Sequence, residues 1–184
     1  MSRFRRLETR LEGLVLIEPT VHPDARGFFF ETYRRKEYAS LGIDAEFVQD
    51  NHSRSVQNTI RALHFQLAPG QAKLIRAARG SIYDVAVDLR RGSPTFGQHE
   101  AFELSDENAR QIFVPVGFAH GFCVTSEAAD VTYKVSSYYD PATERGITFD
   151  DPEIGIPWPA AEALVSDRDR KNPRLAEIAE ELPW

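Results

Sequence analysis

Residues 58–66 read NTIRALHFQ, an apolar run with the bulk of a buried strand. Two chargeable side chains, Arg61 and His64, interrupt it. A polar group inside an apolar strand needs a hydrogen-bond partner or a chemical task. Residues 115–120, PVGFAH, repeat the pattern, because a turn signal is followed by a lone His120 that enters an apolar strand. Two imidazoles that face the inside of one β-barrel would make a site.

The rest of the chain surrounds this stretch with short strands. From residue 58 onwards apolar runs are separated by glycine and proline turn signals, a spacing typical of an antiparallel sandwich or barrel. We therefore predict an all-β chain with short helices at its periphery, at 34–41 and 174–182. The expected strands are 13–19, 27–33, 45–50, 58–66, 72–78, 81–90, 98–104, 110–115, 119–125 and 129–139. Residues 52–55 are polar and predict a loop, and 184 residues predict one domain, 1–184.

Composition excludes several classes of function. The net charge is −6 and the pI is about 5.4, so no basic face is expected for nucleic acid or an anionic membrane. One cysteine, Cys123, excludes a disulfide framework and cysteine-based zinc sites. The N-terminus lacks the apolar core of a signal peptide, and no run approaches membrane-spanning length. We expect a cytoplasmic protein.

The histidines decide between metal chemistry and acid–base chemistry. A metal-binding cupin usually carries a His-x-His pair, whereas residues 64–66 read HFQ, so we predict no metal. A histidine such as His64 or His120, set in an apolar strand, can titrate near neutral pH and act as a general base. The residues leave open whether either is catalytic or structural. The other histidines are expected to be structural: His22, His52 and His99.

Strand parity indicates which side chains can meet. Tyr133 and Tyr139 fall on one face of the run 129–139 and can point into one cavity. Arg61 and His64 do not share parity, so either Arg61 lies at the strand entry or a bulge intervenes. Gln49 and Asn51 also share a face.

Charged residues elsewhere suggest an anionic ligand. Lys73 stands in an apolar run, where a buried ammonium would need an anion. Arginine forks suit phosphate oxygens, so Arg26, Arg61 and Arg168 are candidate phosphate ligands, with solvated surface as the alternative for each.

Six blocks of this sequence together resemble the dTDP-4-dehydrorhamnose 3,5-epimerase family. The likeness runs in order from about residue 11 to 169. The blocks are RGFFFE at 26–31, FVQDNH at 47–52, RALHFQ at 61–66, VAVDL at 85–89, PVGFAHG at 115–121 and SDRD at 166–169.

The resemblance implies a cupin-like antiparallel jelly roll (double-stranded β-helix) that forms a homodimer and uses no metal or other cofactor. It implies inversion of C3 and C5 of dTDP-4-dehydro-6-deoxy-D-glucose, which gives dTDP-4-dehydro-L-rhamnose. His64 matches the proton acceptor, Asp169 the carboxylate that orients it, and Tyr133 the proton donor. Lys73 matches a residue that contacts the sugar, and as a fixed cation it is expected to oppose the negative charge of an enolate intermediate. The remaining matches contact the nucleotide sugar: Arg26, Glu31, Gln49, Asp50, Asn51, Arg61, His120, Glu144 and Arg168, with Tyr139 stacking on thymine.

The sequence departs from the family at three positions and leaves other functions open. Arg168 stands where a lysine is common. Ala62 and Ala72 stand where the family usually has glycine, and each adds a methyl group beside an expected site residue. The nearest alternative is an enzyme of the same fold that inverts only C3 or only C5, or that isomerises the ketone. Further alternatives are a non-catalytic nucleotide-sugar-binding cupin and a metal-dependent cupin enzyme.

Overall fold

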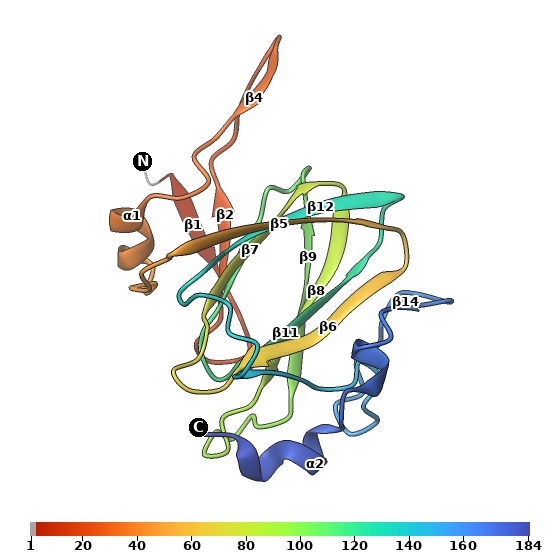
Figure 1. The fold of residues 1–184 in the computed structure, drawn as a ribbon. Coiled ribbons are helices and arrows are strands. Elements are labelled where there is room, and N and C mark those ends of the chain that lie inside the picture. The colour runs from red at the N-terminus through yellow and green to blue at the C-terminus, as the bar shows by residue number, and fades with distance from the viewer. Residues whose placement is uncertain (1–2) are drawn as a thin grey trace.

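The computed structural model describes residues 3–184, whose strands form two six-stranded sheets and a short hairpin (Figure 1). Neighbouring strands pair in antiparallel fashion, except that β14 runs parallel to β6. The antiparallel jelly roll with short peripheral helices that the sequence predicted is confirmed. Within the described residues, no helix is long and apolar enough to cross a membrane.

The first sheet has the order β1-β2-β10-β7-β12-β5, and the second β13-β6-β11-β8-β9 with β14 beside β6. The strands of the first sheet are β1 (Phe4–Leu7), β2 (Val15–Pro19), β10 (Gln111–Val114), β7 (Lys73–Arg79), β12 (Ala128–Val135) and β5 (Gln49–Val56). Those of the second are β13 (Glu144–Gly146), β6 (Thr59–Gln66), β11 (Phe118–Val124), β8 (Ser81–Asp88), β9 (His99–Ser105) and β14 (Leu164–Val165). The other elements are the hairpin strands β3 (His22–Asp24) and β4 (Gly27–Phe29), helices α1 (Arg35–Ser40) and α2 (Leu175–Ile178), and the 3-10 turns η1 (Asp169–Lys171) and η2 (Ala179–Glu181).

The apolar core has three layers. One lies between the sheets, a second covers the outer face of the second sheet with the C-terminal segment, and a third joins α1 to the outer face of the first sheet. Strand β8 shows why its sequence is almost continuously apolar. Ile82 and Ala86 face the layer between the sheets, whereas Val85 and Val87 face the C-terminal layer, so both sides are buried.

Strand β5 corrects two expectations, the strand at 45–50 and the loop at 52–55. It runs from 49 to 56 and pairs with β12 along its whole length. Its residues alternate between exposed ones and half-buried or buried ones. The inward residues are polar, and Gln49, Asn51 and Ser53 line the cavities described below. Because neither face is apolar, the sequence lacks the alternation that usually marks a strand.

Other strands also differ from the expected ones in their presence or in where they end. The charged N-terminal stretch contains β1, which pairs with β2 and buries Phe4. The strand expected at 27–33 ends at Phe29, and the one expected at 129–139 ends at Val135. The hairpin β3–β4 stands away from both sheets (Figure 1). It carries two exposed rings, Phe28 and Phe29.

Candidate active site

Two adjoining cavities of about 280 and 290 Å³ lie where the sheets face one another. They share three residues, of which His64 comes from the second sheet, and Lys73 and Tyr133 come from the first. The first cavity is also lined by Ser53, Thr59, Ile60, Arg61, His120, Phe122, Ser166 and Asp169. The second is also lined by Gln49, Asn51, Phe65, Gln66, Gln71, Tyr139 and Glu144.

A bulge in β6 turns both Arg61 and His64 towards the first cavity. His64 pairs with His120 of β11, but Arg61 pairs with Phe122, so two residues of β6 oppose the single Gly121. A Cβ on Gly121 would lie 2.5 Å from the Cβ of Ala62 in the bulge, so glycine is needed at position 121. Of the two alternatives that parity left for Arg61, the bulge is confirmed.

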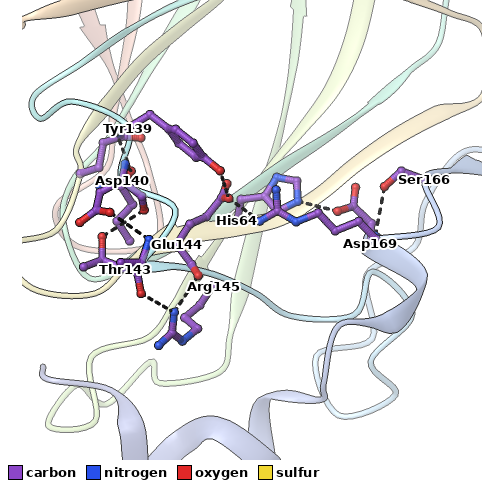
Figure 2. A network of polar contacts seen from close by, with 12 residues as sticks. His64, Tyr139, Asp140, Thr143, Glu144, Arg145, Ser166 and Asp169 are labelled. Atoms are coloured by element: carbon purple, nitrogen blue, oxygen red, sulfur yellow. Dashed lines mark hydrogen bonds and ion pairs between the residues drawn. The ribbon is translucent and has the colours of Figure 1, made fainter.

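His64 is held by a carboxylate that is distant in sequence. Its Nε2 lies 2.7 Å from Oδ1 of the buried Asp169, in the contact drawn in Figure 2. Burial alone would raise the pKa of Asp169, but the hydrogen bond and charge of His64 outweigh it and lower that pKa. Ser166 fixes the carboxylate's segment, since its Oγ accepts from the backbone N–H of Asp169 at 3.1 Å. A carboxylate can only accept, so Nε2 is the donor in this contact, and in the neutral imidazole Nδ1 then keeps a free lone pair.

Lys73 and Tyr133 approach from the opposite sheet. The Lys73 ammonium donates to the backbone oxygen of His64 at 3.2 Å. Burial lowers the pKa of Lys73 to about 8, against the opposing charges of Glu144 and Asp84. Burial also raises the pKa of Tyr133, so its phenol holds a proton firmly at neutral pH. The cavity therefore contains a lone pair, a cation and a hydroxyl donor.

His120 lies beside His64 and has a carboxylate of its own. Its Nε2 is 2.8 Å from Oδ2 of Asp84, which is fully buried in β8. The other carboxylate oxygen of Asp84 has no hydrogen-bond partner among residues 3–184. The sequence alone had assigned no role to Asp84. A carboxylate in a strand that is apolar on both sides was the signal available.

At the far end of the second cavity, Glu144 joins two other predicted residues. Its Oε2 accepts from the hydroxyl of Tyr139 at 2.9 Å and also from the guanidinium of Arg168 (Figure 2). On the same side, Gln49 donates to Asn51 at 2.9 Å. Tyr133 and Tyr139 line this cavity together, as parity predicted, although Tyr139 lies in the loop after β12.

Three residues expected at the site lie elsewhere in this chain. Asp50 points to the outer face of the first sheet and pairs with Lys134 at 2.9 Å. Arg26 lies in the β3–β4 turn and pairs with Asp24. Glu31, before α1, forms ion pairs with Arg3 and Arg34.

The remaining histidines lie outside both cavities. His52, which was expected in a polar turn, belongs to β5 and contacts Asp130 at 3.0 Å. His99 contacts the backbone oxygen of Ile154 at 3.0 Å. His22 is exposed in the projecting hairpin.

Ser53 is a further cavity residue without an assignment from the sequence. Its hydroxyl is buried in the first cavity and has no hydrogen-bond partner within the described chain. It shares parity with Gln49 and Asn51, so continuing that face of β5 by one residue pair would have found it.

The two alanines that replace family glycines pack into the core. Ala62 belongs to the layer under the C-terminal segment and Ala72 to the layer under α1, and neither lines a cavity. Their methyl groups therefore leave the cavities open. Between residues 3 and 184, no three His, Cys, Asp or Glu side chains are grouped to hold a metal ion.

Comparison with known proteins agrees with this geometry. The family model of dTDP-4-dehydrorhamnose 3,5-epimerase matches residues 8–177. The enzyme of that name from Methanothermobacter thermautotrophicus is 46% identical over 180 residues, which cover 96% of this chain and 97% of that protein. The crystal structure of dTDP-6-deoxy-D-glucose-3,5-epimerase from Legionella pneumophila, in complex with dTDP-4-keto-L-rhamnose, superposes with a TM-score of 0.94 and 45% identity, covering 98% of this chain and 97% of that one. A dTDP-4-dehydrorhamnose 3-epimerase from Streptomyces niveus is 41% identical over 91% of this chain and 82% of that protein.

Proposed function

The chain belongs to the dTDP-4-dehydrorhamnose 3,5-epimerase family, and from this we infer that it is an isomerase acting on a dTDP-linked 4-keto sugar. It inverts C3 and C5 of dTDP-4-dehydro-6-deoxy-D-glucose and yields dTDP-4-dehydro-L-rhamnose. We propose that His64, Asp169, Tyr133 and Lys73 carry out the proton transfers.

One observation carries the mechanism: His64 and Tyr133 project from opposing sheets into the same cavities. Inversion at carbon needs a proton removed from one face of the ring and another delivered to the opposite face. A base and an acid on opposing sheets provide these two positions for a sugar ring bound between them.

The reaction follows from the ketone at C4, which acidifies the protons on C3 and C5. Nδ1 of His64 removes such a proton, while Asp169 holds the imidazole and stabilises its cation. The electron pair moves onto the C4 oxygen. Lys73 uses one ammonium hydrogen on the His64 carbonyl and has two more to donate to that developing oxyanion. Tyr133 then delivers a proton to the opposite face of the carbon.

The nucleotide supplies binding energy away from the reacting carbons. We assign thymine stacking to Tyr139 and hydrogen bonds to Gln49 and Asn51 in the second cavity. Arg61 and His120 face the sugar end. Arg168, at the rim beside Glu144, contacts the pyrophosphate. No metal or other cofactor takes part in these steps.

We further propose that residues 1–184 act as one domain, in a cytoplasmic homodimer. The hairpin with Phe28 and Phe29, 62% and 69% exposed, supports an interface with a second copy. Arg26, on the same hairpin, would then serve the site of the other subunit. Glu31 follows that hairpin in the chain, and Asp50 lies on the outer face of the first sheet. We assign both residues to the same interface region.

The test is proton exchange in deuterated water, followed by NMR of the sugar. Deuterium at both C3 and C5 with formation of the L-sugar is expected, and label at neither carbon refutes the epimerase. Label at C3 alone identifies a 3-epimerase, the activity named for the Streptomyces niveus relative. Binding of dTDP without any exchange identifies a binding module. Tyr133→Phe should still exchange label through His64 while forming little inverted product.

A further inference from the structure

We propose that Glu144 is a positioning residue that couples recognition of the nucleotide to the proton-transfer groups. It joins Tyr139 to the segment that carries Asp169, and it places its negative charge beside Lys73 and Tyr133. The inference rests on the proposed function and extends it, because it makes one carboxylate serve both ends of the site.

The contacts of Glu144 show the first half of this coupling. Its side chain is 14% exposed, yet a single oxygen accepts from two more exposed groups, the Tyr139 hydroxyl and the Arg168 guanidinium, which is 59% exposed. These donors come from different segments, the loop after β12 and the start of η1. A bound base and pyrophosphate would contact both segments, so nucleotide binding would act directly on the two hydrogen bonds of Glu144.

The second half is the path to the dyad. Arg168 immediately precedes Asp169, whose carboxylate contacts His64. Glu144 itself belongs to β13, which pairs with β6 so that Gly146 lies opposite His64. Glu144 therefore connects the η1 segment, which lies outside the sheets, to the paired strands β13 and β6, of which β6 carries His64. Loss of this connection would widen the range of distances and orientations between the His64 imidazole and the Asp169 carboxylate.

Charge adds a separate link. The Glu144 carboxylate raises the pKa of Lys73, which burial lowers, and it also raises the pKa of Tyr133. Removing its charge should let the Lys73 ammonium lose its proton at lower pH. The charged and titratable groups around Lys73 are Arg61 and His64 of β6, Asp84 of β8, His120 of β11, Tyr133 of β12, Tyr139 of the loop after β12, Glu144 of β13 and Asp169 of η1.

The decisive variant is Glu144→Gln, which keeps an accepting oxygen and removes the charge. We expect kcat/KM at pH 7.5 to fall about 10- to 100-fold, as for the loss of charge-assisted hydrogen bonds. We also expect kcat to fall and the basic limb of its pH profile to move to lower pH. A purely structural or binding role would leave that limb in place. Tyr139→Phe removes one hydrogen bond without changing the charge, so it should weaken dTDP binding and leave the limb unmoved.

Two further measurements complete the test. Glu103→Gln, an exposed carboxylate on β9, is the matched control and should match wild type. In a double-mutant cycle, Glu144→Gln combined with Asp169→Asn should lose less activity than the product of the single losses, because both act on the same dyad. Multiplicative losses, or an unmoved basic limb in Glu144→Gln, overturn the proposal. Failure of the epimerase assignment is recognised separately, because wild type would then show no exchange.

Discussion

Lys73 provides a test in which stability and activity should change in opposite directions. Its ammonium is buried and donates to one backbone oxygen, and no carboxylate of residues 3–184 forms an ion pair with it. Lys73→Met replaces it by an uncharged chain of similar length. We expect this variant to lose epimerase activity and yet to unfold at a higher temperature than wild type.

The magnitude follows from the pKa. A fall from 10.5 to about 8 in the folded chain corresponds to about 3 kcal/mol of destabilisation at neutral pH. The methionine also gives up the hydrogen bond to His64, worth about 1 kcal/mol. The net gain is about 2 kcal/mol, or about 4 to 8 °C in Tm for a chain of this size.

The assay is thermal unfolding at several pH values. Between pH 8 and 10.5 the unfolded lysine holds a proton that the folded one has released, so wild-type stability rises with pH across this window. The difference between variant and wild type should therefore be largest at pH 7 and close towards pH 10.5. Lys134→Met is the control, because Lys134 is paired with Asp50 and should give no gain.

The reasoning is refuted if Lys73→Met melts at or below the wild-type temperature at pH 7. A constant difference up to pH 10.5 would refute the electrostatic cause as well, since a packing effect has no reason to follow the titration of an amine.

Three further predictions concern the strands and the dyad. Gly121→Ala brings a Cβ to 2.5 Å from the bulged strand opposite, so we expect a loss of about 1 to 3 kcal/mol in chemical unfolding and at least about tenfold in kcat, whereas Gly92→Ala meets nothing within 4 Å and should behave as wild type. Asp88→Asn should destabilise the fold by about 2 to 4 kcal/mol near neutral pH. Burial opposes ionisation of Asp88, but hydrogen bonds from Arg90, Thr95 and Ser93 lower its pKa to about 2. The stabilisation by the carboxylate is therefore present above pH 3.8, and in thermal unfolding at acid pH it should vanish as the pH falls through about 2. Asp169→Asn should slow turnover less than His64→Asn, for which about a hundred- to ten-thousand-fold is expected; equal losses would contradict an orienting role.

The strands that sequence predicted well are those with an apolar face. From β6 to β11 the observed ends lie close to the expected ones, because turn residues and buried side chains define both. Strand β5 was misplaced, since its inward face is polar and its outward face is exposed. Local pattern contains no signal for such a strand, whose pairing with β12 is a long-range property.

The site shows the same division. His64 and His120 stood out because each interrupts an apolar strand, whereas Asp169 was identified through family resemblance alone. Asp169 lies 105 residues from His64 in sequence, on a segment outside the sheets, and only the folded chain brings them together. Arg26 illustrates the remaining gap, because one chain does not reveal which subunit a projecting hairpin serves.

The bulge in β6 divides that strand into two halves of opposite phase. Before it, odd-numbered residues such as Thr59 and Arg61 face the cavity, and after it even-numbered ones such as His64 and Gln66 do. Deleting Ala62 or Leu63 would leave Arg61 and His64 two residues apart, so a regular strand would still turn both side chains towards the cavity. In a library of single-residue deletions, activity should therefore survive better at these two positions than at others in β6.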